Sequence, residues 1–461
     1  MVVKHKFQGR DCVRFVNREP GFAPPPITNG QGARVFIEGY GCSASAADTE
    51  MISGLIDRGG YELVAEPEDA DIRVIVTCAV KKVTEERMLA RIGELASYGK
   101  VIVAGCLAEA EPKQIEKIEP NIGFLGPNRI DRILPVLESA LRGQRRIEVG
   151  SAKLVKLGMP RTRKNRVVGI VEISSGCLSA CTFCQVKLVK GRVFSYPENT
   201  IDDEARTLVD QGAREIWLTS TDNAAYGRDS DSTLPALIRS VCDIPGEFIV
   251  RVGMMNPLLT GRILEEMIEV FGNQKVFKFL HLPVQSGNDR ILKIMQRGYS
   301  VDDFLQIVRA FRNAVPDLTL STDMIVGFPQ ETYAEFEDSL ELLRNVRPDI
   351  VNISRFGPRP GTKAAEMDSQ ISNEESKKRS TIMTELVRRI SNQRNKTWIG
   401  WKGKVLVDEK VKNAVIGRNF SYKPCLIRLD ESASDEVLGH DLVVQITDAT
   451  ASTLRARVSE A

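Results

Sequence analysis

Three cysteines lie close together in one short segment, SSGCLSACTFC, residues 174–184. Cys177, Cys181 and Cys184 have the spacing C-x3-C-x2-C, and the segment holds no obvious fourth ligand. Cysteine thiolates hold iron–sulfur clusters, and a cluster that only transfers electrons normally has four of them. Three thiolates leave one iron open, much as a catalytic zinc site keeps a coordination position for its substrate. The spacing therefore indicates a reactive cluster rather than a purely structural one.

A structural zinc site is the alternative for this triplet. It would need a distant fourth ligand, and the chain has few histidines: His5, His281 and His440. Only His281 falls in the strands of the same region, and we interpret it as a hydrogen-bonded core residue rather than a ligand. An open iron, in contrast, can be chelated by the amino and carboxylate groups of S-adenosylmethionine. We therefore favour the cluster.

A second set of three cysteines lies nearer the N-terminus. Cys42, Cys78 and Cys106 each end a short apolar run, namely ARVFIEGYGC, DIRVIVTC and KVIVAGC. The carboxyl ends of parallel strands share one edge of a sheet, where ligands bind, so the three could converge in space. Buried strand cysteines are the alternative, because cysteine is among the most buried residue types. Three at the same structural position favour a shared metal site.

The composition is that of a globular protein with room for two or three domains. The chain has 461 residues, of which 42% are apolar and 27% charged, and its formal net charge of +2 means that any nucleic-acid contact must come from local patches. No apolar run approaches the roughly 18 residues of a membrane span, and the charged N-terminus lacks a signal peptide. We therefore expect a cytoplasmic protein with no membrane partner and no disulfides. We interpret Cys12, Cys242 and Cys425 as structural or incidental.

The fold class is predicted to be α/β. Residues 1–32 are expected to be an irregular leader, because they are rich in Pro and Gly and have no periodicity. Strands and helices alternate over residues 33–150, which indicates a parallel sheet with crossover helices. Residues 151–166 hold six Lys or Arg and no acid. This run predicts either a solvated linker or a basic strip that contacts phosphate.

Six further strand–helix units follow within residues 167–397. The strand candidates are VVGIVEI, EIWLTS, EFIVRVG, FKFLHLPV, LTLSTDMIVG and DIVNISRF. Six such units predict a partial (β/α)6 barrel of the triosephosphate-isomerase kind, in which active sites lie at the carboxyl ends of the strands. The segment with Cys177 directly follows the first of these strands. Residues 372–397 then read as one long charged helix.

Short strands separated by turns fill residues 398–461, which predicts a small closed β-barrel. Basic residues outnumber acidic ones in its first half, and that half also holds Phe420 and Tyr422. This combination is common in RNA-binding barrels, and a structural cap domain with ordinary surface lysines is the alternative.

The C-x3-C-x2-C triplet, with an aromatic before its last cysteine, resembles the signature of the radical S-adenosylmethionine enzymes. Together with Cys42, Cys78 and Cys106, the pattern resembles their methylthiotransferase branch. The resemblance implies two 4Fe-4S clusters, a radical S-adenosylmethionine core and a C-terminal TRAM barrel. YGCSASAADTEM, RVGMMNP, HLPVQSGND, DMIVGFPQET, FGPRPGT and GRNFSYKP are similar to the archaeal and eukaryotic-type members. These members methylthiolate position 2 of N6-threonylcarbamoyladenosine, at position 37 of tRNA.

Position 2 of a purine carries a C–H bond with neither a leaving group nor useful acidity, so acid–base catalysis has little to act on. The resemblance implies that S-adenosylmethionine is cleaved at Cys177, Cys181 and Cys184 to a radical that abstracts this hydrogen. Methylated sulfur then comes from the second cluster. It also implies three partners: tRNA, an electron donor and a sulfur source.

One segment departs from the family pattern. Members usually carry a Glu after the second core strand, where it helps to bind the amino group of S-adenosylmethionine, but Thr221 stands there in this chain and Asp222 follows. We expect Asp222 to substitute, or cofactor binding to be weaker. Phe183 is expected near the cofactor adenine, with an ordinary core role as the alternative. Gln285 and Asp323 are candidates for contact with the cofactor or the substrate, and hydrogen bonds to backbone groups are the alternative for both.

Five residues are candidates for contact with the RNA. Arg355 and Arg359, around FGPRPG, suit a phosphate or the threonyl carboxylate of the modified base. Arg418, Tyr422 and Lys423, in GRNFSYKP, can stack on bases or pair with phosphate.

Two other functions fit the same residues. One is methylthiolation of a different target, either isopentenyladenosine in tRNA or an aspartate of a ribosomal protein. The other is a non-catalytic RNA-binding protein with structural zinc. A methylthiotransferase with either target predicts a brown, oxygen-sensitive protein, whereas the zinc protein predicts a colourless one.

Overall fold

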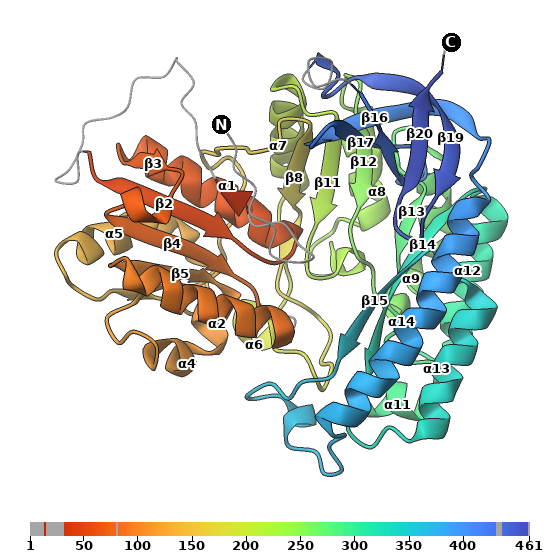
Figure 1. Cartoon of the computed structure of the whole chain (residues 1–461), viewed down its shortest axis with the longest axis horizontal. Helices are drawn as coiled ribbons and strands as arrows, with labels where there is room; N and C mark the ends of the chain where they lie inside the picture. Colours follow the sequence, from red (N-terminus) through yellow and green to blue (C-terminus); the bar gives the residue numbers. More distant parts are fainter. Residues whose placement is uncertain (1–12, 15–31, 80–81, 430–435, 460–461) are drawn as a thin grey trace.

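Figure 1 shows a computed structural model of the chain, which describes residues 13–14, 32–79, 82–429 and 436–459. Most of the expected leader, including Cys12, lies outside these ranges. Within it, Val13–Arg14 forms strand β1, which pairs antiparallel with the next strand, so this part of the leader is regular rather than irregular. Across the described ranges, none of the helices combines the length and apolar character needed to cross a bilayer.

The N-terminal region folds around a seven-stranded sheet, as its strand–helix alternation predicts. The three central strands are neighbours and parallel: β2 (Arg34–Gly39), β4 (Ile72–Thr77) and β5 (Val101–Gly105). They are buried along almost their whole length because helices cover both faces, which explains their continuous apolar runs. The remaining strands are β3 (Glu62–Val64), β6 (Gly123–Leu125) and β7 (Ile147–Glu148).

Helices enclose this sheet from two sides. Helix α1 (Ser43–Arg58) and helix α5 (Ile133–Leu141) pack with one apolar cluster, and α2 (Lys82–Ser97) packs with the other. Each strand that precedes one of Cys42, Cys78 and Cys106 ends within three residues of it. The short helices are α3 (Cys106–Ala110), α4 (Pro112–Glu116) and the 3-10 turns η1 (Pro67–Asp69) and η2 (Ile130–Arg132).

The core confirms the predicted partial barrel. Its six strands form two parallel three-stranded sheets, ordered β12-β11-β8 and β13-β14-β15. A parallel bridge between Val250 and Val276 joins the two sheets into one open arc. The strands are β8 (Val168–Glu172), β11 (Glu215–Thr219), β12 (Ile249–Val252), β13 (Phe279–His281), β14 (Thr319–Val326) and β15 (Ile350–Arg355).

Helices cover the outside of this arc, and their buried faces form the largest apolar cluster with the strands. Helices α12 and α13 both begin with a capping box, in which Ser300 and Asp303, or Thr332 and Glu335, satisfy each other's backbone donors. The helices are α6 (Val186–Lys190), α7 (Glu198–Asp210), α8 (Leu234–Asp243), α9 (Pro257–Thr260), α10 (Leu264–Gly272), α11 (Asp289–Ile294), α12 (Val301–Ala314) and α13 (Tyr333–Val346). The short elements are strands β9 (Ser174–Ser175) and β10 (Phe194–Ser195) and turns η3 (Asn223–Ala225), η4 (Gly261–Ile263) and η5 (Lys363–Ala365).

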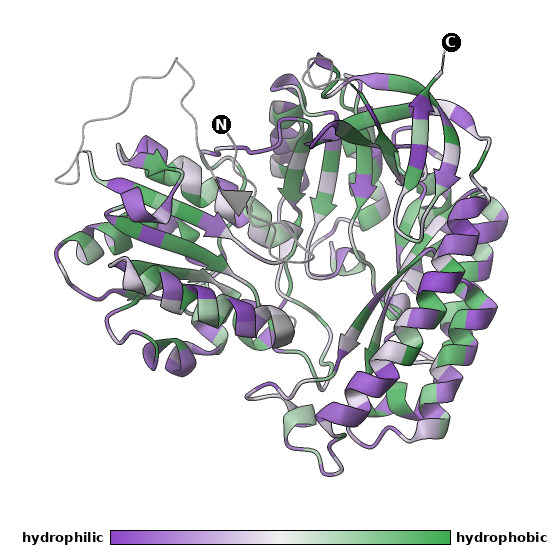
Figure 2. Cartoon of the chain, in the orientation of Figure 1, coloured by the Kyte–Doolittle hydropathy of each residue, from purple (hydrophilic) through white to green (hydrophobic). Residues whose placement is uncertain are grey.

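The long charged helix is α14 (Asn373–Lys396), and after it the chain closes into the predicted barrel. Figure 2 shows both polar and apolar residues on this helix and mainly apolar residues along the core strands. The barrel strands are β16 (Lys402–Val411), β17 (Ala414–Arg418), β18 (Pro424–Ile427), β19 (Asp441–Ala449) and β20 (Leu454–Val458).

The barrel lies across the amino ends of the core strands (Figure 1). Four contacts reach residues that precede or begin a core strand. Lys278 donates its backbone N–H to Phe420 O at 2.8 Å, and Lys423 Nζ lies 2.7 Å from Asp349 Oδ1. Asn165 Nδ2 donates to Asp408 O, and Arg214 Nη1 donates to Gly439 O. The carboxyl ends of the core strands, where the cysteine segment lies, are therefore opposite the barrel.

The basic run at residues 151–166 is partly buried between the N-terminal region and the core. Lys156 Nζ lies 2.6 Å from Asp48 Oδ1 and 3.0 Å from Glu172 Oε2, and its side chain is almost fully buried. Arg161 is also buried, with Nε 2.8 Å from Glu204 Oε1. The expectation of a solvated or phosphate-contacting segment is wrong for these two cations, because they neutralise buried acids.

Candidate functional site

The segment with Cys177, Cys181 and Cys184 forms a tight loop at the carboxyl end of β8, between β9 and α6. Gly176 has φ +79°, and a Cβ there would fall 2.0 Å from Arg192 O. Only glycine fits at this turn. The backbone N–H of Cys177 donates to Gly191 O, and that of Cys184 donates to Cys181 O. The loop is thus tied at both ends.

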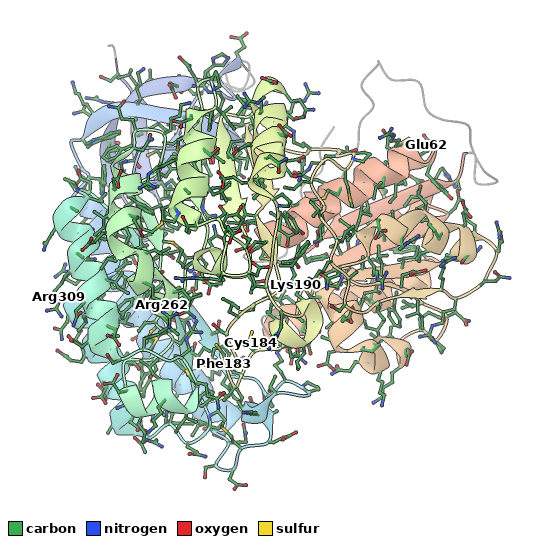
Figure 3. All side chains as sticks on the ribbon, turned by 180° about the vertical axis from the view of Figure 1, so that it is seen from behind. Glu62, Phe183, Cys184, Lys190, Arg262 and Arg309 are labelled. Atoms are coloured by element: carbon green, nitrogen blue, oxygen red, sulfur yellow. The ribbon has the colours of Figure 1, made fainter. Side chains whose placement is uncertain are left out.

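The three thiols of this loop lie near one another and are partly shielded from water. Burial raises the pKa of Cys184 to about 12, and the neighbouring thiols Cys181 and Cys177 add to the rise. The backbone N–H of Val186 donates to Cys184 Sγ at 3.4 Å. Figure 3 places Phe183 and Cys184 on the segment between the core and the N-terminal region. Among the described residues, no group of three or more His, Cys, Asp or Glu side chains is placed so that it could hold a metal ion.

Asp222 lies beside this loop, at the carboxyl end of β11. Its Oδ1 atom accepts hydrogen bonds from Asn256 N at 3.0 Å and from Ala224 N at 3.2 Å. Its Oδ2 atom is buried and has no hydrogen-bond partner in the described part of the chain. Burial raises the pKa of Asp222 to about 6. The pKa of Cys177 is also raised, first by burial and second by the negative charge of Asp222. A buried carboxylate oxygen beside the thiols suits a cationic amino group, whereas Thr221 supplies no carboxylate.

Polar side chains from three neighbouring strands meet further along the same arc. Asp323 Oδ1 lies 3.0 Å from His281 Nε2 and accepts from Asn352 Nδ2 at 2.7 Å. His281 is therefore hydrogen-bonded, as expected. Gln285 is buried with φ +77°, and its backbone pairs with β14 through Asp323 O and Ile325 N. A buried non-glycine residue in this conformation is typical of functional sites.

Phe183 packs in a small apolar cluster. Its ring lies 6.4 Å from that of Phe328, edge to face, and Ile291, Met295 and Ala364 belong to the same cluster. This contact agrees with the core role that was the alternative for Phe183. Its expected contact with the cofactor adenine stays a prediction.

The second triplet lies at the carboxyl edge of β2, β4 and β5, as predicted from the strand order. Gly41 has φ +124°, and a Cβ there would fall 2.5 Å from Cys78 Cβ, so the loop before Cys42 approaches Cys78 closely. Burial raises the pKa of Cys106 to about 11, and Cys42 lies close enough to add to the rise. The thiol donors therefore suit a thiophilic metal centre. None of the eight described cysteines forms a disulfide.

A buried charge network connects the two triplets. Lys190, in α6, lies 3.2 Å from Glu172 Oε1, and Lys156 contacts the other oxygen of the same carboxylate. The positive charges of Lys190 and Lys156 act on Cys106 against the effect of burial. Figure 3 shows Lys190 and Cys184 at the boundary between the core and the N-terminal region.

The two arginines around FGPRPG, Arg355 and Arg359, occupy different environments. Arg355 is the last residue of β15 and is exposed. Arg359 is 5% exposed and forms an ion pair with Glu85 of helix α2. Its guanidinium thus already meets a carboxylate from the N-terminal region, which limits a direct contact between Arg359 and RNA.

The expected RNA contacts at Arg418, Tyr422 and Lys423 do not match the positions of these side chains. Lys423 is 3% exposed, with Nζ bonded to Asp349 and Asn395. The Tyr422 ring is buried against Phe277, Phe279 and Trp217 and closes the amino end of the core arc. Arg418 lies over this ring and pairs with Asp408 at 3.0 Å. This basic, aromatic segment was predicted to be a surface, but its side chains lie in the interface between barrel and core.

Sequence reasoning missed three residues of the site. Arg297 donates from Nη1 to Cys181 Sγ at 3.0 Å, although the two are 116 positions apart. Asn256 orients Asp222, and the positive charge of Lys190 acts on Cys106. Only Asn256 lay in a segment that had been noticed, RVGMMNP. No spacing signal marks the other two, because their contacts depend on the tertiary fold.

Comparison with known families and structures agrees with this architecture. Residues 171–343 match the model of the radical SAM superfamily, and residues 34–126 match a family described as uncharacterized protein family UPF0004. A structure of the radical S-adenosylmethionine methyltransferase TsrM from Kitasatospora setae aligns with TM-score 0.53 and 13% identity. It covers 73% of this chain and 74% of TsrM, which shows a shared fold.

Sequence relatives extend over nearly the whole chain. A probable threonylcarbamoyladenosine tRNA methylthiotransferase from Pyrococcus abyssi is 41% identical over 430 residues, covering 92% of this chain and 99% of the relative. The threonylcarbamoyladenosine tRNA methylthiotransferase of Homo sapiens is 33% identical over 414 residues, covering 88% and 71%. Because these relatives match most of the chain at 33–41% identity and the core matches the radical SAM model, the chain belongs to the threonylcarbamoyladenosine tRNA methylthiotransferase family, within the radical S-adenosylmethionine enzymes.

Proposed function

We propose that this chain replaces the C2 hydrogen of N6-threonylcarbamoyladenosine, at position 37 of tRNA, with a methylthio group. The observation that carries the proposal is the full-length similarity to relatives of that name, in a chain with two cysteine triplets at strand carboxyl edges. Radical enzymes of this class use S-adenosylmethionine and a 4Fe-4S cluster, and these supply one-electron chemistry for an unactivated C–H bond.

The residues have the following proposed roles. Cys177, Cys181 and Cys184 hold the first cluster, and Asp222 accepts the amino group of S-adenosylmethionine through its unpartnered Oδ2 atom. Cys42, Cys78 and Cys106 hold a second 4Fe-4S cluster from which sulfur is delivered. The buried Lys156 network keeps the two triplets at a fixed separation.

Contact with tRNA is proposed at the open end of the core. Arg355 is exposed at the carboxyl end of β15, the same edge as the first triplet, where a guanidinium can pair with phosphate or the threonyl carboxylate. The barrel contacts more distant parts of the tRNA. An electron donor and a sulfur source are the remaining proposed partners.

Two measurements test the proposal. Anaerobically purified protein should contain about eight irons with matching sulfide, following from two four-iron clusters. Nucleoside mass spectrometry of tRNA from a deletion strain should show N6-threonylcarbamoyladenosine without its methylthio group. Loss of the methylthio group from isopentenyladenosine instead would assign the other tRNA target, and a colourless zinc protein would exclude the enzyme.

Single cysteine variants separate the two triplets. Cys177→Ala should abolish cleavage of S-adenosylmethionine, whereas Cys42→Ala should spare cleavage and stop sulfur insertion. Cys242→Ala is a control, because this buried cysteine lies in α8 away from both triplets. Equal loss of cleavage in the Cys42 and Cys177 variants would contradict the division of roles.

A further inference from the structure

Arg297 is a buried cation whose hydrogen bonds converge on the cysteine loop. It follows helix α11 and is 7% exposed. Its Nη1 atom donates to Cys181 Sγ at 3.0 Å, which is short for a bond to sulfur. Burial works against the Arg297 charge, but Tyr299 and Cys181 outweigh it, so the pKa of Arg297 is raised. The guanidinium therefore stays charged beside the sulfur.

The orientation of Arg297 is set by a second buried residue. Arg297 Nε donates to Tyr299 Oη at 3.0 Å, and the Tyr299 hydroxyl lies 2.8 Å from Val284 O. Arg297 Nη2 also donates to Pro283 O at 3.4 Å. The guanidinium is thus held by the loop after β13, and its remaining edge points at Cys181. Asp222 lies near enough for the Arg297 charge to lower its pKa against the larger effect of burial.

We propose that Arg297 sets the reduction potential of the cluster held by Cys177, Cys181 and Cys184, by donating a charge-assisted N–H···S hydrogen bond to Cys181. The inference rests on the proposed function, because it assumes a cluster at this loop. Reduction adds one electron and hence one negative charge, with no bond made or broken. A fixed cation and a hydrogen bond at a ligand sulfur stabilise the more negative state, so they raise the potential.

The test is a redox titration of the full chain, with dithionite as reductant and electron paramagnetic resonance as readout. The parent protein for all variants carries Cys42→Ala, Cys78→Ala and Cys106→Ala, so that only one cluster titrates. Arg297→Gln removes the charge and should shift the potential to a more negative value. Arg297→Lys keeps the charge but not the fork geometry and should shift it less. Tyr299→Phe removes the hydroxyl that orients Arg297 and should give a shift in the same direction.

Arg290→Gln is the matched control, because Arg290 is half exposed and pairs with Glu335 rather than with a cysteine. It should titrate at the parent potential. The proposal is overturned if Arg297→Gln retains about four irons and titrates with the parent, or if the control shifts as much. If Arg297→Gln loses its iron, the other two variants decide: the proposal is overturned if Arg297→Lys and Tyr299→Phe both have the reduction potential of the parent protein. A parent without iron would overturn the proposed function as well.

Discussion

Lys156 Nζ lies 2.6 Å from Asp48 Oδ1, and the two residues are 108 positions apart in the chain. Asp48 belongs to helix α1, which begins directly after Cys42, and Lys156 also contacts Glu172 in β8, which leads to the Cys177 loop. The ion pairs are inaccessible to water, so they are sensitive to the loss of any member. One lysine thus joins the supports of both cysteine triplets.

Replacing Lys156 should therefore destabilise the chain strongly. Lys156→Met keeps the length of the side chain but leaves Asp48 and Glu172 without this partner, at an expected cost of about 3–5 kcal/mol. Lys153→Met is the control, because this exposed lysine of the same segment should matter by about 0.5 kcal/mol or less. Thermal unfolding under oxygen-free conditions checks both. Equal midpoints for the two variants would exclude a supporting role for the buried network.

Replacing Asp222 should weaken binding of S-adenosylmethionine without loss of iron. Asp222→Asn keeps the shape but removes the charge that the buried Oδ2 atom carries, and a hydrogen bond to a charged group contributes about 1.5–3 kcal/mol. The expected loss of affinity is therefore roughly tenfold to a hundredfold. Calorimetric titration of the reconstituted protein measures it, with iron content determined in parallel.

Asp231→Asn is the matched control for Asp222, because Asp231 is exposed in the loop before α8. It should bind the cofactor like the unchanged chain. An unchanged affinity in Asp222→Asn, with full iron, would mean that another group receives the amino nitrogen.

Replacing Glu215 should alter how stability depends on pH. Burial, followed by the charge of Asp408, raises the pKa of Glu215 to about 8, although Trp217, Arg418 and Arg251 act in the opposite direction. The folded chain then holds a proton that the unfolded chain loses near pH 4.5, so stability falls as the pH rises from about 4.5 to 8. Glu215→Gln cannot ionise and should lack this part of the fall.

The Gln variant should thus have a higher unfolding midpoint than the unchanged chain at pH 9, with a smaller difference at pH 4. Its amide oxygen still accepts from Trp217 Nε1, as the carboxylate does at 2.9 Å. Differential scanning calorimetry at the two pH values measures the effect. Parallel pH profiles for the two proteins would show that Glu215 ionises normally.

Two substitutions at Tyr422 separate an interface role from an RNA contact. Tyr422→Ala leaves a cavity among Phe277, Phe279 and Trp217, at an expected cost of about 3–5 kcal/mol, whereas Tyr422→Phe keeps the ring. The unfolding midpoint of the Ala variant should fall, and tRNA affinity of the Phe variant should stay unchanged. If Tyr422→Ala binds tRNA more weakly but is as stable as the unchanged chain, Tyr422 contacts the RNA as the sequence predicted.

The alternation of apolar strands and helices predicted the α/β class and the partial barrel, whereas the cluster site indicated by the spacing of Cys177, Cys181 and Cys184 stays a prediction. Local patterns suffice for these features, because strand periodicity and ligand spacing are properties of neighbouring residues. The position of Cys42, Cys78 and Cys106 at one edge of the sheet could also be predicted, because the carboxyl ends of parallel strands lie at the same edge.

Local sequence patterns could not predict which charged side chains are buried. Lys156 and Lys423 stand in basic runs that read as surface, yet each neutralises an acid far away in the chain. Arg297 and Cys181 are similarly distant in sequence. Such pairs depend on how separate elements pack together, which composition and periodicity do not encode.

The barrel and the cysteine loop occupy opposite ends of the core strands, so a substrate that contacted both would have to span the length of these strands. Strand β14 has eight residues, which corresponds to about 25 Å at about 3.3 Å per residue. If an RNA contacts the barrel while its target base lies at the thiols, it has to bridge at least that distance around the outside of the core. A folded tRNA arm can do so, and a free nucleoside engages only one end.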